Sequence, residues 1–352
     1  MAAYTAIDDP ELYIQCKLYT GTGSEIAATL DGSENMQPDL VAIKARTDAE
    51  SFKVYDSVRG VTKHIEWDST DAEATEAQGL KSFDSDGFTI GTYSSINASD
   101  SHNYVAWCWK AGTAFSNDAS ATSIGSIDST GSVNDTAGIS ICSFTGTGSN
   151  GTIKHGLSTA PRAMLFKNRD EGAEGWFVFH ESVGNTKRLN LDDVAAESAS
   201  STFWQDTSPS SSIFTVGSNH GCNGPDAMIG YIFSEKQGFS KFGQYYGNAN
   251  ADGPFVYTGF KVGWLLIRRP GASENWMLLD NKRLGYNGAN YYFESQANSA
   301  EATGGDRVDF LSNGFKIRNT WTSINNSGSK IIYMAFAEAP FVNSNGVPCN
   351  AR

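Results

Sequence analysis

Charged residues and prolines are scarce in this sequence, while glycine and aromatic residues are plentiful. Only 18% of the 352 residues are Asp, Glu, Lys or Arg, and nine are Pro, against 36 Gly and 12% aromatic residues. No segment shows a sustained helical heptad pattern, which excludes a mainly helical protein. Short alternating strands joined by glycine turns fit this composition, so we predict an all-β fold.

Long apolar runs are missing as well. No run approaches the length of a membrane span, and the start Met1–Tyr4 lacks the basic region and the apolar core of a secretion signal. The five cysteines are odd in number and form no C-x-x-C pair. We therefore expect no membrane insertion and no zinc site. Small buried thiols in a protein made in a reducing cytosol are the simplest interpretation.

Basic residues are outnumbered by acidic ones. The 26 Lys and Arg residues against 39 Asp and Glu residues give a formal net charge of −13. Such a chain repels a phosphate backbone or an anionic membrane surface instead of neutralising its charge. We therefore expect no nucleic acid among its partners.

Catalytic, metal and cofactor motifs are absent or incomplete. The sequence has no G-x-S-x-G elbow and no pair of histidines at ligand spacing around a glutamate. Gly146–Gly151 fits G-x-G-x-x-G, but His155, Gly156 and Pro161 interrupt the helix that a dinucleotide site needs, so a turn is predicted. Asp84–Gly87 resembles part of a calcium loop, where a turn is favoured and calcium is the alternative. We predict no catalytic residues, no metal and no cofactor.

The strand-like stretch Tyr104–Lys110 is echoed twice later in the chain. Each copy closes a segment of about one hundred residues, which indicates three versions of one unit. In each copy a small residue precedes an aromatic one, at Ala106-Trp107, Gly230-Tyr231 and Ala335-Phe336. Further landmarks keep the same register, namely turns at Gly21, Gly146 and Gly247, strand-end cations at Lys44, Lys167 and Arg268, and strand-end polar residues at Asp56, His180 and Asp280.

Each repeat supplies alternating strands, and their apolar face must be covered by a second sheet. We therefore predict three tandem β-sandwich modules of the jelly-roll or lectin-like type. Asp71–Lys81 and Leu191–Ser200 are expected to add a short helix or a surface loop. The predicted organisation is an N-terminal arm over residues 1–14, repeat 1 over 15–112, a Ser/Thr/Gly linker over 113–138, repeat 2 over 139–238, repeat 3 over 239–341 and a C-terminal tail over 342–352.

Two groups of residues are candidates for binding. Trp204 and Trp321 fall in predicted loops, where an indole could stack on a sugar ring, although most aromatic residues of β modules belong to the core. Tyr4, Leu12 and Tyr13 in the N-terminal arm could dock on their own domain or on a neighbour. The sequence leaves both alternatives open.

A set of longer motifs runs through nearly the whole chain. They are Ala3–Pro10 with Leu18–Gly23, Asp56–Gly60, Tyr104–Lys110, Gly156-Leu157 with Lys167–Arg169, Gly253–Phe260 and Tyr333–Phe341. Together these motifs resemble a family of repeat-bearing virion proteins from tailed phages of cyanobacteria and other marine bacteria. The family pattern carries no catalytic residues that could be transferred to this chain.

The resemblance implies a non-enzymatic structural component of the particle, most similar to a tail fibre or a tail-associated protein that acts in assembly and host-surface contact. It implies a homo-oligomer such as a trimer, because fibres gain rigidity and multivalent contact in this way. The implied partners are other virion proteins and a host cell-surface glycan or protein, and assembly takes place in the host cytoplasm. A capsid decoration or head-fibre protein is one alternative, and a polysaccharide-binding or depolymerising enzyme is another.

Overall fold

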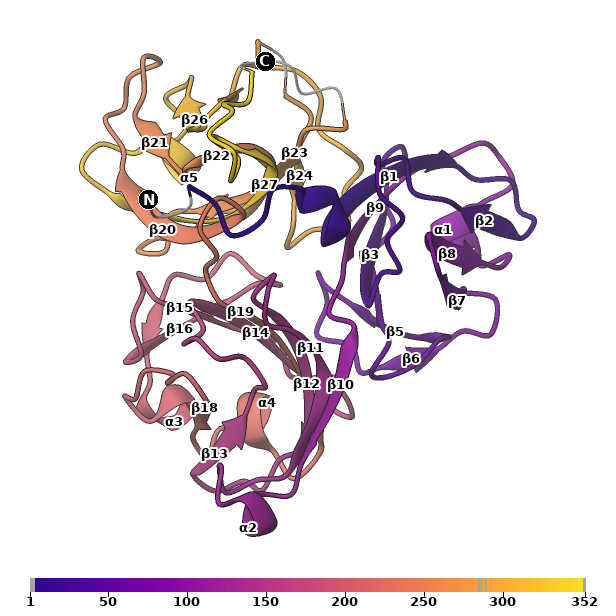
Figure 1. Cartoon of the computed structure of the whole chain (residues 1–352), viewed down its shortest axis with the longest axis vertical. Helices are drawn as coiled ribbons and strands as arrows, with labels where there is room; N and C mark the ends of the chain where they lie inside the picture. Colours follow the sequence, from indigo (N-terminus) through magenta and orange to yellow (C-terminus); the bar gives the residue numbers. More distant parts are fainter. Residues whose placement is uncertain (1–3, 284–286, 289, 351–352) are drawn as a thin grey trace.

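The fold is that of a computed structural model of the chain, which describes residues 4–283, 287–288 and 290–350. Six antiparallel sheets dominate these residues, and the helices among them are single turns, so the predicted all-β class is confirmed. None of these helices is long and apolar enough to cross a membrane. Each repeat contributes one large sheet and one small sheet, and Figure 1 shows the three repeats around a common centre.

Repeat 1 packs a six-stranded sheet on a three-stranded one. Strand β3 (Leu40–Ala45) is buried at every position, because Val41 and Ile43 pack toward the small sheet while Leu40 and Ala42 pack toward the other repeats. The large sheet has the order β1 (Ile14–Thr20), β9 (Asn103–Trp109), β3, β4 (Lys53–Asp56), β5 (Lys63–Glu66) and β6 (Ala74–Thr75). The small sheet has the order β2 (Ile26–Ala28), β8 (Gly87–Ile90) and β7 (Leu80–Asp84), and the single-turn helices are η1 (Pro10–Leu12) and α1 (Ser94–Asn97).

Repeat 2 has the largest sheet, with eight strands. Its order is β10 (Thr113–Asn117), β11 (Ser129–Asn134), β12 (Ile139–Thr145), β19 (Ala227–Phe233), β14 (Ala163–Asn168), β15 (Trp176–His180), β16 (Lys187–Asn190) and β17 (Ser198–Ala199). The small sheet pairs β13 (Gly151–Lys154) with β18 (Ile213–Val216). The single-turn helices are α2 (Ala119–Thr122), α3 (Ser201–Trp204) and α4 (His220–Asn223).

Repeat 3 repeats the arrangement with five and three strands. Its large sheet has the order β20 (Ser240–Tyr246), β27 (Lys330–Pro340), β22 (Phe260–Arg268), β23 (Met277–Asp280) and β24 (Phe293–Glu294). Its small sheet has the order β21 (Phe255–Tyr257), β26 (Gly314–Ile317) and β25 (Val308–Leu311), and its helix is α5 (Thr322–Asn325). The pairing of β22 with β27 is interrupted by β-bulges near Val262.

One hydrophobic cluster draws on the large sheets of all three repeats. Trp109 of repeat 1 meets Trp264 of repeat 3 with ring centroids 5.7 Å apart, and Phe233 of repeat 2 meets Phe336 of repeat 3 at the same distance. The central strands therefore have two apolar faces, whereas we predicted only one. The continuous apolar runs of β3 and β14 are the expected pattern for strands covered on both sides.

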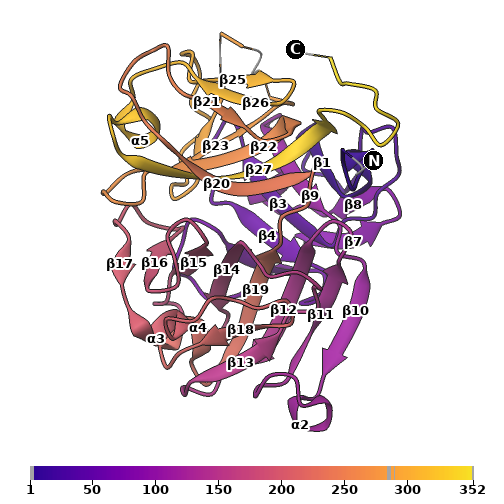
Figure 2. The ribbon, with the colours of Figure 1, turned by 60° about the vertical axis from the view of Figure 1, so that its left-hand side comes forward.

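The segment 113–138 is not a linker, so this prediction was wrong. Its strands β10 and β11 form a hairpin that extends the large sheet of repeat 2 beyond β12 (Figure 2). Small residues are needed at this place because a side chain at Gly131 would overlap the ring of Phe115. A composition of Ser, Thr and Gly thus reflects close packing here and not flexibility.

A buried cation at the end of a central strand reaches from each repeat into the next. Each cation donates a hydrogen bond to a backbone carbonyl, and the three contacts run in one direction around the ring. They are Lys44 to Asn298 (3.0 Å), Lys167 to Thr70 (2.8 Å) and Arg268 to Asn190 (2.8 Å). Burial lowers the pKa of both Lys44 and Lys167 to about 8.

A glutamate in a loop of each repeat makes the second set of contacts between repeats. Its backbone N–H donates to a carbonyl of the neighbouring repeat. That carbonyl belongs to the residue two positions after the strand-end cation. The pairs are Glu73 to Arg169 (2.8 Å), Glu197 to Pro270 (2.7 Å) and Glu301 to Arg46 (2.8 Å). The stretches Asp71–Lys81 and Leu191–Ser200 hold two of these glutamates in loops with the short strands β6 and β17, so they add loops, not helices.

The strand-end residues Asp56, His180 and Asp280 make the third set. Tyr231 of repeat 2 donates its hydroxyl to Asp56 of repeat 1 (2.7 Å), and Trp107 of repeat 1 donates Nε1 to Asp280 of repeat 3 (3.0 Å). His180 of repeat 2 instead lies 3.1 Å, measured from Nε2, from a backbone oxygen of repeat 3. All three positions are buried, so the repeats lock together through polar groups as well as apolar ones.

A buried asparagine holds the glycine turn of each repeat in place through hydrogen bonds. Asn97, Asn223 and Asn325 are the last residues of α1, α4 and α5, and all three are fully buried. Each accepts a hydrogen bond from a backbone N–H of the turn and donates to two carbonyls. The stretch Gly146–Gly151 therefore includes a turn that ends in β13, as predicted, and not a dinucleotide loop.

Candidate functional site

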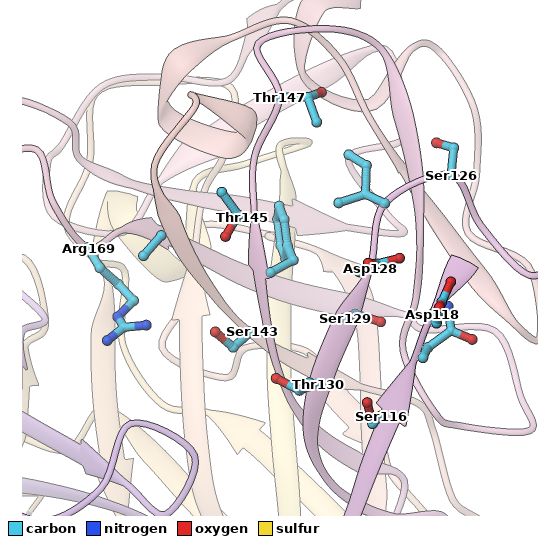
Figure 3. Close-up of a pocket in the computed structure, with 14 residues that line it drawn as sticks. Ser116, Asp118, Ser126, Asp128, Ser129, Thr130, Ser143, Thr145, Thr147 and Arg169 are labelled. Carbon is cyan, nitrogen blue, oxygen red and sulfur yellow. The ribbon is translucent and has the colours of Figure 1, made fainter. Parts of the chain in front are cut away.

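An open groove with a volume of about 660 Å³ lies on repeat 2. Figure 3 shows Arg169 at one end of it and Asp118 with Ser126 at the other. Half of the lining side chains carry a hydroxyl. The lining residues are Ser116, Asn117, Asp118, Ser126, Ile127, Asp128, Ser129, Thr130, Ser143, Phe144, Thr145, Thr147, Arg169 and Ala227.

The floor of the groove is a row of hydroxyls across three strands. Ser116 on β10 lies opposite Thr130 on β11, which lies opposite Ser143 on β12. Directly opposed residues of antiparallel strands have neighbouring side chains on one face. In repeats 1 and 3 the strands equivalent to β12 are β1 and β20, which are edge strands among the described residues. The hairpin therefore builds the groove, and only repeat 2 has it.

The charged residues of the groove are held by their own neighbours. Asp118 caps α2 by accepting from Ala121 N–H (3.0 Å). A hydrogen bond from the Ser120 hydroxyl, and then the one from Ala121 N–H, lowers the pKa of Asp118. At the opposite end Arg169 donates Nε to Glu73 of repeat 1 (2.9 Å). These groups are fixed in place, so the rim is preorganised.

The lining determines what the groove can do chemically. The 14 residues include no His, Cys or Lys, and the ionisable ones are Asp118, Asp128 and Arg169. Hydroxyls both donate and accept hydrogen bonds, and Arg169 only donates. Because the lining holds two aspartates and one arginine that is paired with Glu73, the arrangement suits a polar, uncharged ligand held by many hydrogen bonds.

Three side chains of repeat 2 bring potential metal ligands together. One atom each of Glu171, His220 and Asp226 lie within 4.8 Å of one another. Asn168, which is fully buried, donates to Asp226 Oδ2 (2.9 Å). This bond accounts for the position of the carboxylate without an ion, and both Glu171 and His220 are exposed.

The two predicted glycan contacts lie far apart in the fold, one in repeat 2 and one in repeat 3. The prediction for Trp204 was wrong. Trp204 is the last residue of α3, it is only 1% exposed, and its Nε1–H donates to Lys187 O (3.0 Å). Trp321 is half-buried beside Tyr292, and the guanidinium of Arg307 lies 4.4 Å from its ring centroid. A sugar contact at Trp321 stays a prediction.

The three predicted arm residues contact this same chain to different degrees. Tyr13 packs edge-on against Phe239 of repeat 3, with centroids 5.9 Å apart, and Leu12 is half-buried at the end of η1. Tyr4 leaves 58% of its surface exposed. The arm thus lies against the third repeat of the same chain, and docking of the exposed Tyr4 on a neighbouring protein stays a prediction.

Sequence reasoning missed the groove because eight of its 14 lining residues lie in the segment taken for a linker. One local signal was present: Asp118 precedes a short run of Ala, Ser and Thr, and aspartate is a preferred helix cap. The alternation of Phe115 and Val133 with polar neighbours was too weak to indicate strands.

The comparisons with known proteins give one family. The model of a domain of unknown function, DUF7483, matches residues 9–340, which include all three repeats. No curated protein matches the chain.

Proposed function

We propose that this chain, which belongs to the DUF7483 family, is a non-enzymatic structural component of a tailed phage particle. Its place in the particle is a tail fibre or another tail-associated position, where it acts in assembly and in contact with the host surface. The motifs that resemble repeat-bearing virion proteins support this proposal. So does an interlocked body in which every repeat is fixed to both others.

The groove on repeat 2 is the observation that carries the host-contact part of the proposal. A hairpin that the other repeats lack adds an exposed hydroxyl row to a rigid body, and no packing need of the sheet calls for the row. Loops and additions on a rigid scaffold are the usual places for binding residues. A host cell-surface glycan or protein is the proposed ligand.

The finer fold and the oligomeric state belong to the same proposal. Each pair of a large and a small sheet is a sandwich of the jelly-roll or lectin-like type, which the clusters between the paired sheets support. A homo-oligomer such as a trimer would use outer surfaces, because the inner faces of the large sheets already cover one another. Other virion proteins are the proposed partners within the particle.

Immunogold labelling of purified virions tests the location. Antibodies raised against the chain are expected to label the tail. Label on the head instead would overturn the tail assignment in favour of a capsid decoration protein. Absence of label from intact and from detergent-opened particles would overturn the proposal that the chain is a virion component.

Competition for host adsorption tests the groove. Excess purified chain is expected to slow phage adsorption, and Thr130→Trp, which fills the hydroxyl row, is expected to remove that effect. Thr113→Trp is the matched control, since Thr113 is exposed on the same hairpin outside the groove. Equal competition by both variants would show that the groove takes no part in host contact.

A further inference from the structure

A second cavity, of about 390 Å³, lies between the N-terminal arm and repeat 3. Its walls include two tyrosines that are unusually exposed, Tyr4 at 58% and Tyr257 at 54%. Its polar lining includes Glu235, Gln237 and Lys241. Figure 1 shows the N-terminal segment crossing from repeat 1 to repeat 3 beside β20. None of these side chains lines the groove of repeat 2.

The arm is anchored right beside this cavity. Ala6 N–H and the Thr5 hydroxyl both donate to Gln237 O, at 3.1 and 3.2 Å. Gly238 has φ +77°, and a Cβ there would overlap the Thr5 side chain, so the arm can approach this closely only at a glycine. These contacts place Tyr4 as a wall of the cavity, where it faces the start of β20.

Comparison of the three repeats shows that the fold does not require an aromatic residue at Tyr257. Val256 pairs with Phe315 as Ile153 pairs with Phe214 in repeat 2 and as Ala28 pairs with Phe88 in repeat 1. The residue after each is therefore equivalent, and it is Tyr257, Lys154 and Thr29 respectively. Two repeats form the same small sheet with a polar residue at this position. The ring of Tyr257 is therefore not needed for packing, and what distinguishes it from other exposed aromatic residues is that it lines the same cavity as Tyr4.

The groups around Tyr257 have the chemistry of a sugar site. Lys241 Nζ donates to Tyr257 O (3.2 Å) and lies 5.5 Å from the ring centroid, which orients the phenol. The carboxylate of Glu235 accepts from Phe242 N–H (3.3 Å) through one oxygen and can accept sugar hydroxyls through its remaining lone pairs. Aromatic faces for the C–H side of a ring, with a carboxylate, an amide and an ammonium for its hydroxyls, match a saccharide.

We propose that the cavity between Tyr4 and Tyr257 binds a saccharide of the host surface. The proposal rests on the proposed function, since it adds to the groove of repeat 2 a second site of contact with the host surface and names its ligand class. The volume lies at the small end of the range of about 300–1,000 Å³ for ligand cavities, so it suits a short stretch of glycan and not a folded partner. Tyr4 and Tyr257 stack on the sugar, and Glu235 and Lys241 hold its hydroxyls.

Binding of the full chain to outer-membrane vesicles from a strain that the phage infects tests the proposal, with biolayer interferometry as the readout. Tyr257→Thr installs the residue of repeat 1 and is expected to weaken binding at least tenfold. Tyr4→Ala, in the exposed arm, is expected to act in the same direction. Tyr246→Thr is the matched control: Tyr246 is equally exposed at the other end of β20, and repeats 1 and 2 have Thr20 and Thr145 there.

Vesicles treated with periodate, which cleaves vicinal diols, separate a sugar from a protein ligand. Loss of binding after periodate but not after proteinase K supports the proposal. Loss after proteinase K alone identifies a protein ligand and overturns it, as does unchanged binding by both Tyr257→Thr and Tyr4→Ala. Equal thermal unfolding of the variants excludes misfolding as the cause. Immunogold label on the tail is independent of these outcomes, so failure here leaves the proposed location standing.

Discussion

Two of the three interfaces between repeats have a buried ion pair at their centre, and the third has a neutral histidine. Asp280 accepts from Arg283 Nε at 2.6 Å, and Asp56 forms the equivalent pair with Arg59. In repeat 2 the same position is His180, which is 1% exposed. The fold thus accepts two different chemistries at one equivalent place.

The difference follows from the aromatic residue that each position faces. Tyr231 and Trp107 carry a donor and meet an aspartate, whereas Phe336 occupies the same place in repeat 3 and has no polar atom. In repeat 2, His180 accepts from Ser182 N–H through Nδ1 (3.1 Å) and donates Nε2–H to Tyr333 O of repeat 3. The arginine is replaced by Val183. Donor, acceptor and counterion change together, because a half-satisfied buried network is costlier than an apolar one.

Removing one partner of an ion pair is the largest break in this comparison. Asp280→Ala leaves Arg283 buried without its closest counterion and Trp107 Nε1 without its acceptor. We expect the free energy of unfolding to fall by about 3–5 kcal/mol. Equilibrium denaturation in urea measures it. Arg283→Leu in the same chain should recover part of the loss, and a cost below 1 kcal/mol for Asp280→Ala alone would contradict a central role for the pair.

The pH dependence separates the histidine interface from the ionic ones. Burial lowers the pKa of His180 from 6.5 to about 4. Between these values the unfolded chain binds a proton that the folded chain refuses, so stability falls as the pH drops from 6.5 towards 4. The glutamine of His180→Gln cannot titrate. Over this pH range we therefore expect the free energy of unfolding of the variant, measured in urea, to fall by up to about 3 kcal/mol less than that of wild type.

Burial lowers the pKa of His64 and of His155 to about 4 as well, so all three histidines contribute to the acid limb of wild type. The difference between wild type and His180→Gln isolates one of them. The pKa of Asp280 is lowered by Arg283 despite its burial, so its contribution is lost only below the usual pKa of 3.8. Parallel curves for the two proteins between pH 6.5 and 4 would show that His180 is already charged in the folded state.

Exchanging an aromatic residue gives the smallest effect and sharpens the comparison most. Tyr231→Phe copies Phe336 into the interface with Asp56 and removes the hydroxyl that donates to Asp56 and accepts from Arg59. We expect a loss of about 2 kcal/mol in urea denaturation. Adding Asp56→His and Arg59→Val transplants the whole neutral set, and the triple variant should be more stable than the sum of its single changes. Strict additivity would show that the three positions do not act as a unit.

The architecture within each repeat was predictable, because strand and turn signals are local. The runs around Leu40–Lys44 and Ala163–Lys167 combine a short apolar stretch with flanking turns, and the matched spacing of landmarks fixed their order. The shared core was not predictable. A strand that is buried on both faces has the same sequence pattern whether its second face packs against its own repeat or against another repeat. Only the pairing of Trp109 with Trp264 shows which applies.

The errors at the candidate sites have one cause. Small polar residues surround Trp204 and fill 113–138, and such composition was taken to mean exposure. In both places close packing requires small neighbours: Gly131 admits the Phe115 ring, and a side chain at Gly217 would overlap the backbone of Thr202 in α3. Exposure is a property of the assembled fold, so the tyrosines at 4 and 257 became distinguishable from core aromatics only in three dimensions.

Closure of the ring also sets how this kind of chain can change. A linear repeat array can gain or lose a unit at either end, since each unit touches only its neighbours. Here Lys44 of the first repeat donates to a carbonyl of the third, so the three repeats form a closed ring. A chain with two repeats would leave an apolar face with tryptophans exposed to water, and the closed ring has no position for a fourth repeat. Further duplication of the repeat is therefore not possible beyond three copies. Later diversification is confined to insertions such as the β10–β11 hairpin and to amino-acid substitutions on the outer surface.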